Sequence, residues 1–135
     1  MRNLTTLTLL CAVALTFACN KNENANIGDK KLIGKWQLSE SLADPGNGSG
    51  KWIAVSGDDA KKYFKLNADG TTEGTAFEGY TKYAVKDSLF LRLIKPDKSA
   101  ILYRFNISNT SLTLSPDSPS RCIEACGTRF KRDKD

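Results

Sequence analysis

Two cysteines near the C-terminus offer the most accessible chemistry in this chain. Cys122 and Cys126 are separated by three residues and followed by Gly127. In an extended strand they would lie about 13 Å apart, beyond disulfide distance, so only a turn can join them. Redox-active pairs favour two intervening residues, and a closed zinc site needs further ligands. We therefore predict a structural disulfide, with a redox pair or two metal-binding thiolates as the alternatives.

Catalysis by other groups is restricted because the 135 residues include no histidine. Its absence excludes Ser-His-Asp and Cys-His nucleophile activation and histidine-based metal sites. Paired carboxylates can cleave glycosidic bonds without histidine, which leaves a small hydrolase as one hypothesis. The available acids lie in turns or among polar residues, namely Asp58, Asp59, Glu73, Glu78 and Asp87. We expect no catalytic residue, no metal and no cofactor.

The charge balance is basic but dispersed. Twenty Lys and Arg oppose fifteen Asp and Glu, a formal net charge of +5. The cations alternate with acids along the chain, whereas nucleic-acid binding requires a continuous basic face with aromatic platforms. We expect no nucleic-acid partner.

The first 18 residues are typical of a targeting segment. Arg2 precedes an uncharged apolar run from Leu4 to Ala18, which is shorter than the roughly 20 residues of a membrane-spanning helix. Cys19 and a polar stretch follow. This pattern resembles a bacterial lipoprotein signal, in which a small residue precedes the cysteine that is lipidated and becomes the N-terminus. The resemblance implies lipidation of Cys19; an ordinary cleaved signal and an uncleaved anchor are the alternatives, and both export the domain.

The rest of the chain divides into a tether and one domain. Residues 19–30 are rich in Asn and Lys, a composition typical of a flexible tether, and residues 31–135 form the domain. Asn20 stands where Asp would indicate retention in the inner membrane of Gram-negative cells. The lipoprotein resemblance therefore implies a cell-envelope protein, lipid-anchored in the outer membrane.

Short runs of alternating apolar and polar residues, separated by turn residues, predict an antiparallel all-β fold. The clearest run is Ala100 to Ile107, and we also expect a strand over Thr71 to Phe77 and one helical turn within Gly57 to Lys62. Eight or nine strands fit into the domain. Their spacing allows either an up-and-down barrel or a β-sandwich.

The two ends of the domain favour the barrel. Gly34-Lys35-Trp36 opens it and Cys-Ile-Glu-Ala-Cys-Gly-Thr-Arg-Phe-Lys closes it, and together these segments resemble bacterial lipocalin-like lipoproteins. The resemblance implies a lipocalin-like barrel of about eight strands whose closed end is plugged by Trp36. It also implies that an arginine of the last strand stacks on this indole, and Arg129 is the candidate.

A lipocalin-like barrel implies a small apolar or amphipathic ligand. The candidate ligand-binding residues are on the apolar strand faces: Leu38, Phe64, Leu66, Leu91, Tyr103 and Phe105. Packing in a core is the other role open to them. Arg92 and Arg104 interrupt apolar strands, so they either meet an anionic group of a ligand or lie solvated on the outer face. The alternative function is an envelope protein-interaction module with a filled barrel, whose loop from Asp44 to Gly50 contacts another protein.

Overall fold

The computed structural model describes residues 30–134. The predicted signal segment, the lipidation site Cys19 and nearly all of the predicted tether lie outside this range. The described chain forms nine strands and one short 3-10 helix, η1 (Asp59–Lys61), in the region where one helical turn was expected. The strands are β1 (Gly34–Ala43), β2 (Lys51–Ala54), β3 (Tyr63–Leu66), β4 (Thr72–Gly74), β5 (Lys82–Lys86), β6 (Phe90–Ile94), β7 (Ala100–Ile107), β8 (Ser111–Ser118) and β9 (Cys126–Arg132).

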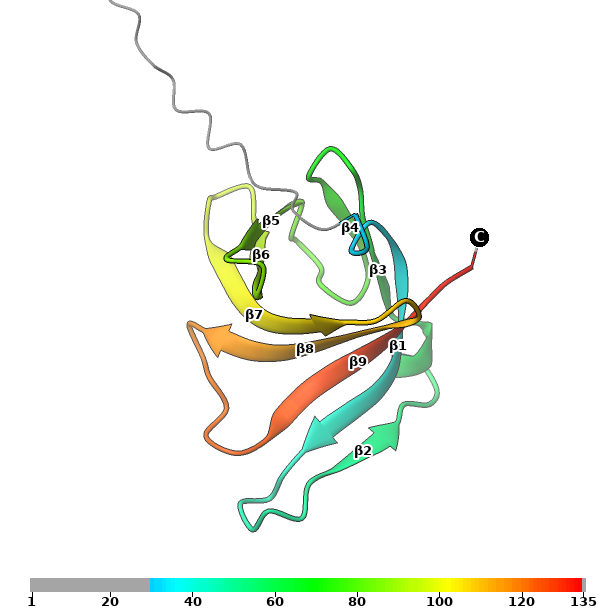
Figure 1. Ribbon diagram of the computed structural model, residues 1–135, viewed down its shortest axis with the longest axis vertical. Coiled ribbons are helices and arrows are strands. Elements are labelled where there is room, and N and C mark those ends of the chain that lie inside the picture. The colour runs from blue at the N-terminus through cyan, green and yellow to red at the C-terminus, as the bar shows by residue number, and fades with distance from the viewer. Residues whose placement is uncertain (1–29, 135) are drawn as a thin grey trace, which may run out of the picture.

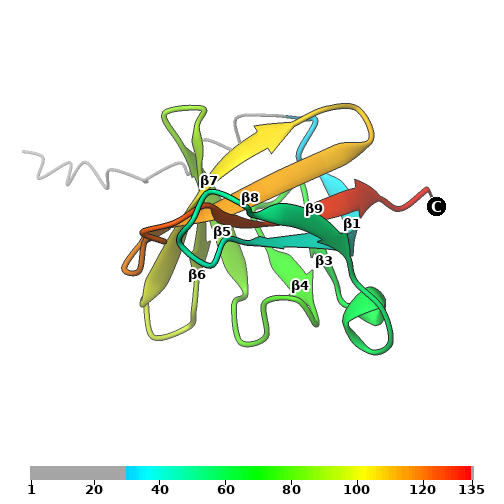
Figure 2. The same cartoon turned by 90° about the horizontal axis from the view of Figure 1, so that it is seen from below.

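All nine strands belong to one antiparallel sheet that curls into a nearly closed barrel (Figure 1, Figure 2). Eight strands follow the order β4-β3-β1-β9-β8-β7-β6-β5, and β2 pairs with the second half of β1. The first strand therefore lies beside the last. The two edges meet at an isolated antiparallel bridge between Thr71 and Lys82, so the barrel prediction is confirmed and the two-layer sandwich is excluded.

Alternation along each strand places apolar side chains inside the barrel. Leu91 and Leu93 of β6 and Leu112 and Leu114 of β8 are fully buried, whereas Arg92 between the first pair is exposed. Burying one such side chain stabilises the fold by about 1.5–3 kcal/mol. The interior is therefore mostly a packed core.

The closed end of the barrel, its base, is built around Trp36. This side chain is completely buried, and its Nε1 donates a hydrogen bond to the carbonyl of Leu32 at 2.8 Å. The guanidinium of Arg132 lies 4.2 Å from the centre of a Trp36 ring. It also donates hydrogen bonds to the carbonyls of Ile33 (2.9 Å), Asn109 (3.2 Å) and Lys31. Arg132 thus clamps the segment before β1 and the β7–β8 turn over the base.

The prediction that Arg129 fills this role is wrong. Arg129 lies over Trp52 instead, 4.1 Å from its ring centre, and pairs with Glu40 at 2.5 Å. The reason is strand alternation: Phe130 points into the barrel, so Arg129 must point out, while Arg132 shares the face of Phe130 and is the register partner of Trp36. Gly50-Lys51-Trp52 repeats the three residues of Gly34-Lys35-Trp36, and the tryptophan of each segment consequently has its own arginine from β9.

Candidate functional site: a pocket at the mouth of the barrel

The end of the barrel opposite Trp36, its mouth, contains an open pocket of about 410 Å³. β1 and β9 reach the mouth at Leu42 and Cys126, and the segment after β4 covers part of it. Ligand pockets in proteins are about 300–1,000 Å³, so this one is large enough for a small molecule. The lining is Leu38, Ser41, Leu42, Lys62, Ala76, Phe77, Tyr103, Pro116, Cys126, Gly127, Thr128 and Phe130.

Aromatic rings form the floor of the pocket. The Phe77 ring centre lies 5.4 Å from that of Tyr103 and 6.0 Å from that of Phe130. Phe64 packs edge-on beneath them, at 5.2 Å from Phe77 and 4.8 Å from Phe130. Edge-to-face contacts of this kind add about 0.5–1.5 kcal/mol beyond burial. The floor is therefore an apolar surface of mutually packed rings.

Phe77 reaches the floor because β4 ends three residues before it. The strand expected over Thr71 to Phe77 is therefore shorter than predicted. β4 ends at Gly74, which has a φ of +128°, and a Cβ there would lie 2.3 Å from the Tyr63 carbonyl oxygen. Only glycine fits this close approach. The chain then turns, with the Ala76 N–H bonded to the same Tyr63 carbonyl at 2.9 Å, and folds Phe77 over the open end.

One charged side chain, Lys62, lines the pocket. Its Nζ lies 2.7 Å from Asp59 Oδ1, and this hydrogen-bonded ion pair raises the pKa of Lys62. The side chain stays charged at neutral pH at the rim, while the floor below is apolar. Ser41, Tyr103 and Thr128 add hydroxyl groups to the lining, and burial raises the pKa of the Tyr103 hydroxyl, which keeps it neutral. The pocket thus combines an apolar floor with polar groups around it.

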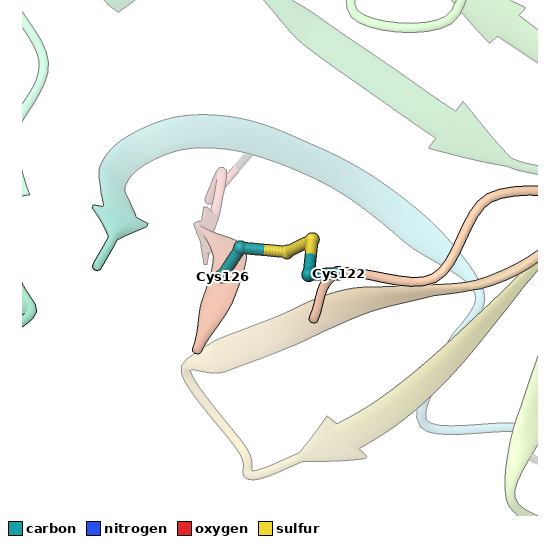
Figure 3. The surroundings of a disulfide bond; sticks show 2 residues. All are labelled: Cys122 and Cys126. Atoms are coloured by element: carbon teal, nitrogen blue, oxygen red, sulfur yellow. A yellow bond between two sulfur atoms is a disulfide. The ribbon is translucent and has the colours of Figure 1, made fainter. Parts of the chain in front are cut away.

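The predicted disulfide between Cys122 and Cys126 is present (Figure 3) and joins a pocket-lining residue to the loop before β9. The two Cα atoms are 6.1 Å apart, against about 13 Å in an extended strand, because residues 119–125 turn between β8 and β9. Cys126 begins β9 and lines the pocket. The bond therefore fixes the start of the strand that supplies Thr128 and Phe130.

A second loop is fastened beside the disulfide. The Asp44 carboxylate accepts hydrogen bonds from the backbone N–H groups of Gly50 (2.9 Å), Gly46 (2.9 Å), Asn47 (3.1 Å) and Gly48 (3.1 Å). These bonds, that of Gly50 foremost, lower the pKa of Asp44. The Asp44 N–H in turn donates to the Ala125 carbonyl at 3.0 Å. The two loops form one preorganised side of the mouth.

The six predicted ligand-binding residues lie at different depths in the barrel: two line the pocket and four belong to the core or pack against it. Leu38 and Tyr103 line the pocket. Phe64, Leu66 and Leu91 have no exposed surface and belong to the sealed core, and Phe105 packs against that core without lining the pocket. Alternation predicts which side chains point inward, but not how far each lies from the mouth.

Several pocket residues were not predicted from the sequence. Phe77 was assigned to a strand, and Ala76, Pro116 and Thr128 were not selected because they carry no functional group of note. The pattern Glu73-Gly74-Thr75 contained a usable signal, since an isolated glycine within a strand pattern indicates a bulge or a close backbone approach.

Residues 30–134 contain no group of three or more Cys, Asp or Glu side chains able to hold a metal ion, and no helix long and apolar enough to cross a membrane. Asp58 and Asp59 are each ion-paired with a lysine, at 2.9 and 2.7 Å.

Comparison with known proteins does not identify a relative: no family model, no curated protein sequence and no solved structure matches this chain.

Proposed function

We propose that this protein is an exported lipocalin-like protein, lipid-anchored through Cys19 in the cell envelope, that binds a small amphipathic molecule in the mouth pocket. The observation that carries the proposal is the open, aromatic-floored pocket of about 410 Å³ above an otherwise packed barrel. A ligand's apolar part would lie on Phe77 and Phe130, and its polar part would face the rim at Lys62. The protein would act by binding, without catalysis.

The geometry of the pocket supports binding at low conformational cost. The floor is packed, the start of β9 is fixed by the disulfide, and the adjacent loop is held by Asp44. Preorganised sites lose less free energy in ordering their side chains, so more of the contact energy appears as affinity.

The test is to fill the pocket. Ala76→Trp places a large ring in the lining, while Ala68→Trp puts the same ring on an exposed turn at the base. With the fluorophore 1-anilinonaphthalene-8-sulfonate as probe, we expect Ala76→Trp to weaken binding about tenfold, equivalent to about 1.4 kcal/mol, and Ala68→Trp to leave it unchanged. Equal binding by both variants would refute the pocket as the site. Mass spectrometry of protein purified gently from its host should in addition detect a bound small molecule.

A protein-interaction module is the second candidate, because Ile123 is 99% exposed at the tip of the disulfide loop. The disulfide and the hydrogen bond from the Asp44 N–H to the Ala125 carbonyl fasten the loop that carries Ile123, and a preorganised loop favours a contact with another protein. Crosslinking in intact cells tests this role. A partner that is lost in Ile123→Asp but retained in Ile53→Asp, a control at an isoleucine that is 66% exposed, would support it.

A further inference from the structure

The outer face of three neighbouring strands carries four cations and no acid. Lys82 and Lys86 on β5, Arg92 on β6 and Arg104 on β7 are all exposed, and these strands contain no Asp or Glu. We call this surface the basic face. It gathers charges that are dispersed along the sequence.

Strand register places Arg92 at the centre of the basic face. Arg92 is directly opposite Ala84 on β5 and Leu102 on β7. Lys82 and Lys86 stand two residues to either side of Ala84, and Arg104 stands two residues beyond Leu102. Diagonal neighbours of this kind in an antiparallel sheet are about 7–8 Å apart. Three like charges thus surround the central arginine.

Among the residues that the structure describes, no acid forms an ion pair with any of these four cations. The six ion pairs among residues 30–134 use other cations, namely Lys35, Lys61, Lys62, Lys65, Arg121 and Arg129. Arg104 instead lies over the ring of Phe90, at 5.3 Å from its centre. Like charges brought together without acids repel one another, so the basic face is complementary to an external anionic group.

Apolar side chains lie between the cations. Phe90, Ile94 and Leu102 point to the same side of the sheet and are half-buried. Beside them is a shallow groove of about 360 Å³ whose lining includes Lys86, Arg92, Leu102 and Ser118. Long cationic side chains can lie along such apolar surface and extend their charged ends outward. A surface that mixes cations with apolar groups is typical of proteins that rest on a lipid–water interface.

We propose that the basic face docks onto an anionic lipid surface, with headgroup phosphates seated around Arg92. Guanidinium groups bind phosphate oxygens in bidentate fashion, and each basic residue near an anionic membrane adds to the attraction. The inference rests on the lipid anchor of the proposed function. Ten residues separate Cys19 from Lys30, and their extended length is at most about 35 Å. The anchored barrel therefore remains close enough to the membrane for the basic face to meet it.

The test uses the mature lipidated protein, beginning at Cys19, on vesicles of phosphatidylcholine, with and without added phosphatidylglycerol. Lysines are acylated with a membrane-impermeant amine reagent and quantified by mass spectrometry. We expect Lys82 and Lys86 to react about fivefold more slowly on the anionic vesicles, the factor that one cation near such a surface supplies. High salt should restore their reactivity, because it shortens the screening length. The exposed Lys51 and Lys131, on β2 and β9, should react equally on both.

A charge-reversal pair provides the matched control. Arg92→Glu combined with Arg104→Glu should abolish the lipid-dependent protection, whereas Lys51→Glu combined with Lys131→Glu, an equal change of net charge, should preserve it. Equal acylation on both kinds of vesicle, or equal protection of the control lysines, would overturn docking by this face. Protection in host cells without protection on anionic vesicles would indicate an acidic protein partner and would also overturn it.

Attachment through the lipid anchor is measured separately from docking of the basic face. Flotation with purely neutral vesicles reports the anchor, since these carry no charge to attract the basic face. Failure to float would refute lipidation alone, and acylation in the presence of excess anionic vesicles would still decide whether the basic face docks.

Discussion

Replacing Arg132 by alanine should destabilise the barrel more than any other single arginine substitution in β9. The variant loses a part-buried charged hydrogen bond to Ile33, worth about 1.5 kcal/mol, and the contact with Trp36, about 1 kcal/mol. Two exposed hydrogen bonds, to the carbonyls of Lys31 and Asn109, add about 0.5 kcal/mol together. We therefore expect the free energy of unfolding to fall by about 3 kcal/mol. Urea denaturation followed by tryptophan fluorescence measures it.

Arg129→Ala is the matched control, because Arg129 also lies over an indole but on the outer face. Its ion pair with Glu40 and its contact with Trp52 are partly exposed, so their loss should cost only about 1 kcal/mol. Arg132→Lys keeps the charge but not the planar fork, and we expect an intermediate loss. A loss in Arg129→Ala that equals or exceeds the loss in Arg132→Ala would refute the assignment of Arg132 as the clamp of the base.

Three further predictions concern the mouth and β4. Replacing both Cys122 and Cys126 by serine should lower the free energy of unfolding by about 2 kcal/mol; the variant's urea midpoint should then be insensitive to reductant, and a midpoint equal to that of the oxidised wild type would contradict this. Asp44→Ala should loosen its loop at neutral pH, seen as shifted amide resonances. Because the pKa of Asp44 in the folded protein is lowered from 3.8, the stabilisation of the loop by its carboxylate is present above that pH and is lost as the pH falls through the folded pKa. Loop amides of the wild type that titrate above pH 3.8 would contradict this expectation. Gly74→Ala should lower the free energy of unfolding by about 3 kcal/mol or more, through backbone strain and overlap with β3. Gly57→Ala should lower it by only about 1 kcal/mol, because Gly57 has a positive φ but open space around it. Equal melting temperatures of the two variants would argue against the overlap.

The sequence by itself determined the strand content and the inward-facing stripes. Alternation is a local property of extended backbone, so Ala100–Ile107 could be assigned directly, and its inner face packs on the core. The disulfide was also accessible, because only a turn brings two cysteines at this spacing together. Even Arg132 could have been identified, since it shares the inward parity of Phe130.

Tertiary structure alone decided depth along the barrel and which residues from distant strands became neighbours. Phe64 and Tyr103 both point inward, yet one is sealed in the core and the other lines the pocket. Likewise, Lys82, Arg92 and Arg104 form one cluster only because β5, β6 and β7 pair in a particular register. Register is fixed by hydrogen bonds and core packing between segments far apart in the chain. A period-two pattern specifies the face of a side chain, while non-local pairing specifies its height and its neighbours.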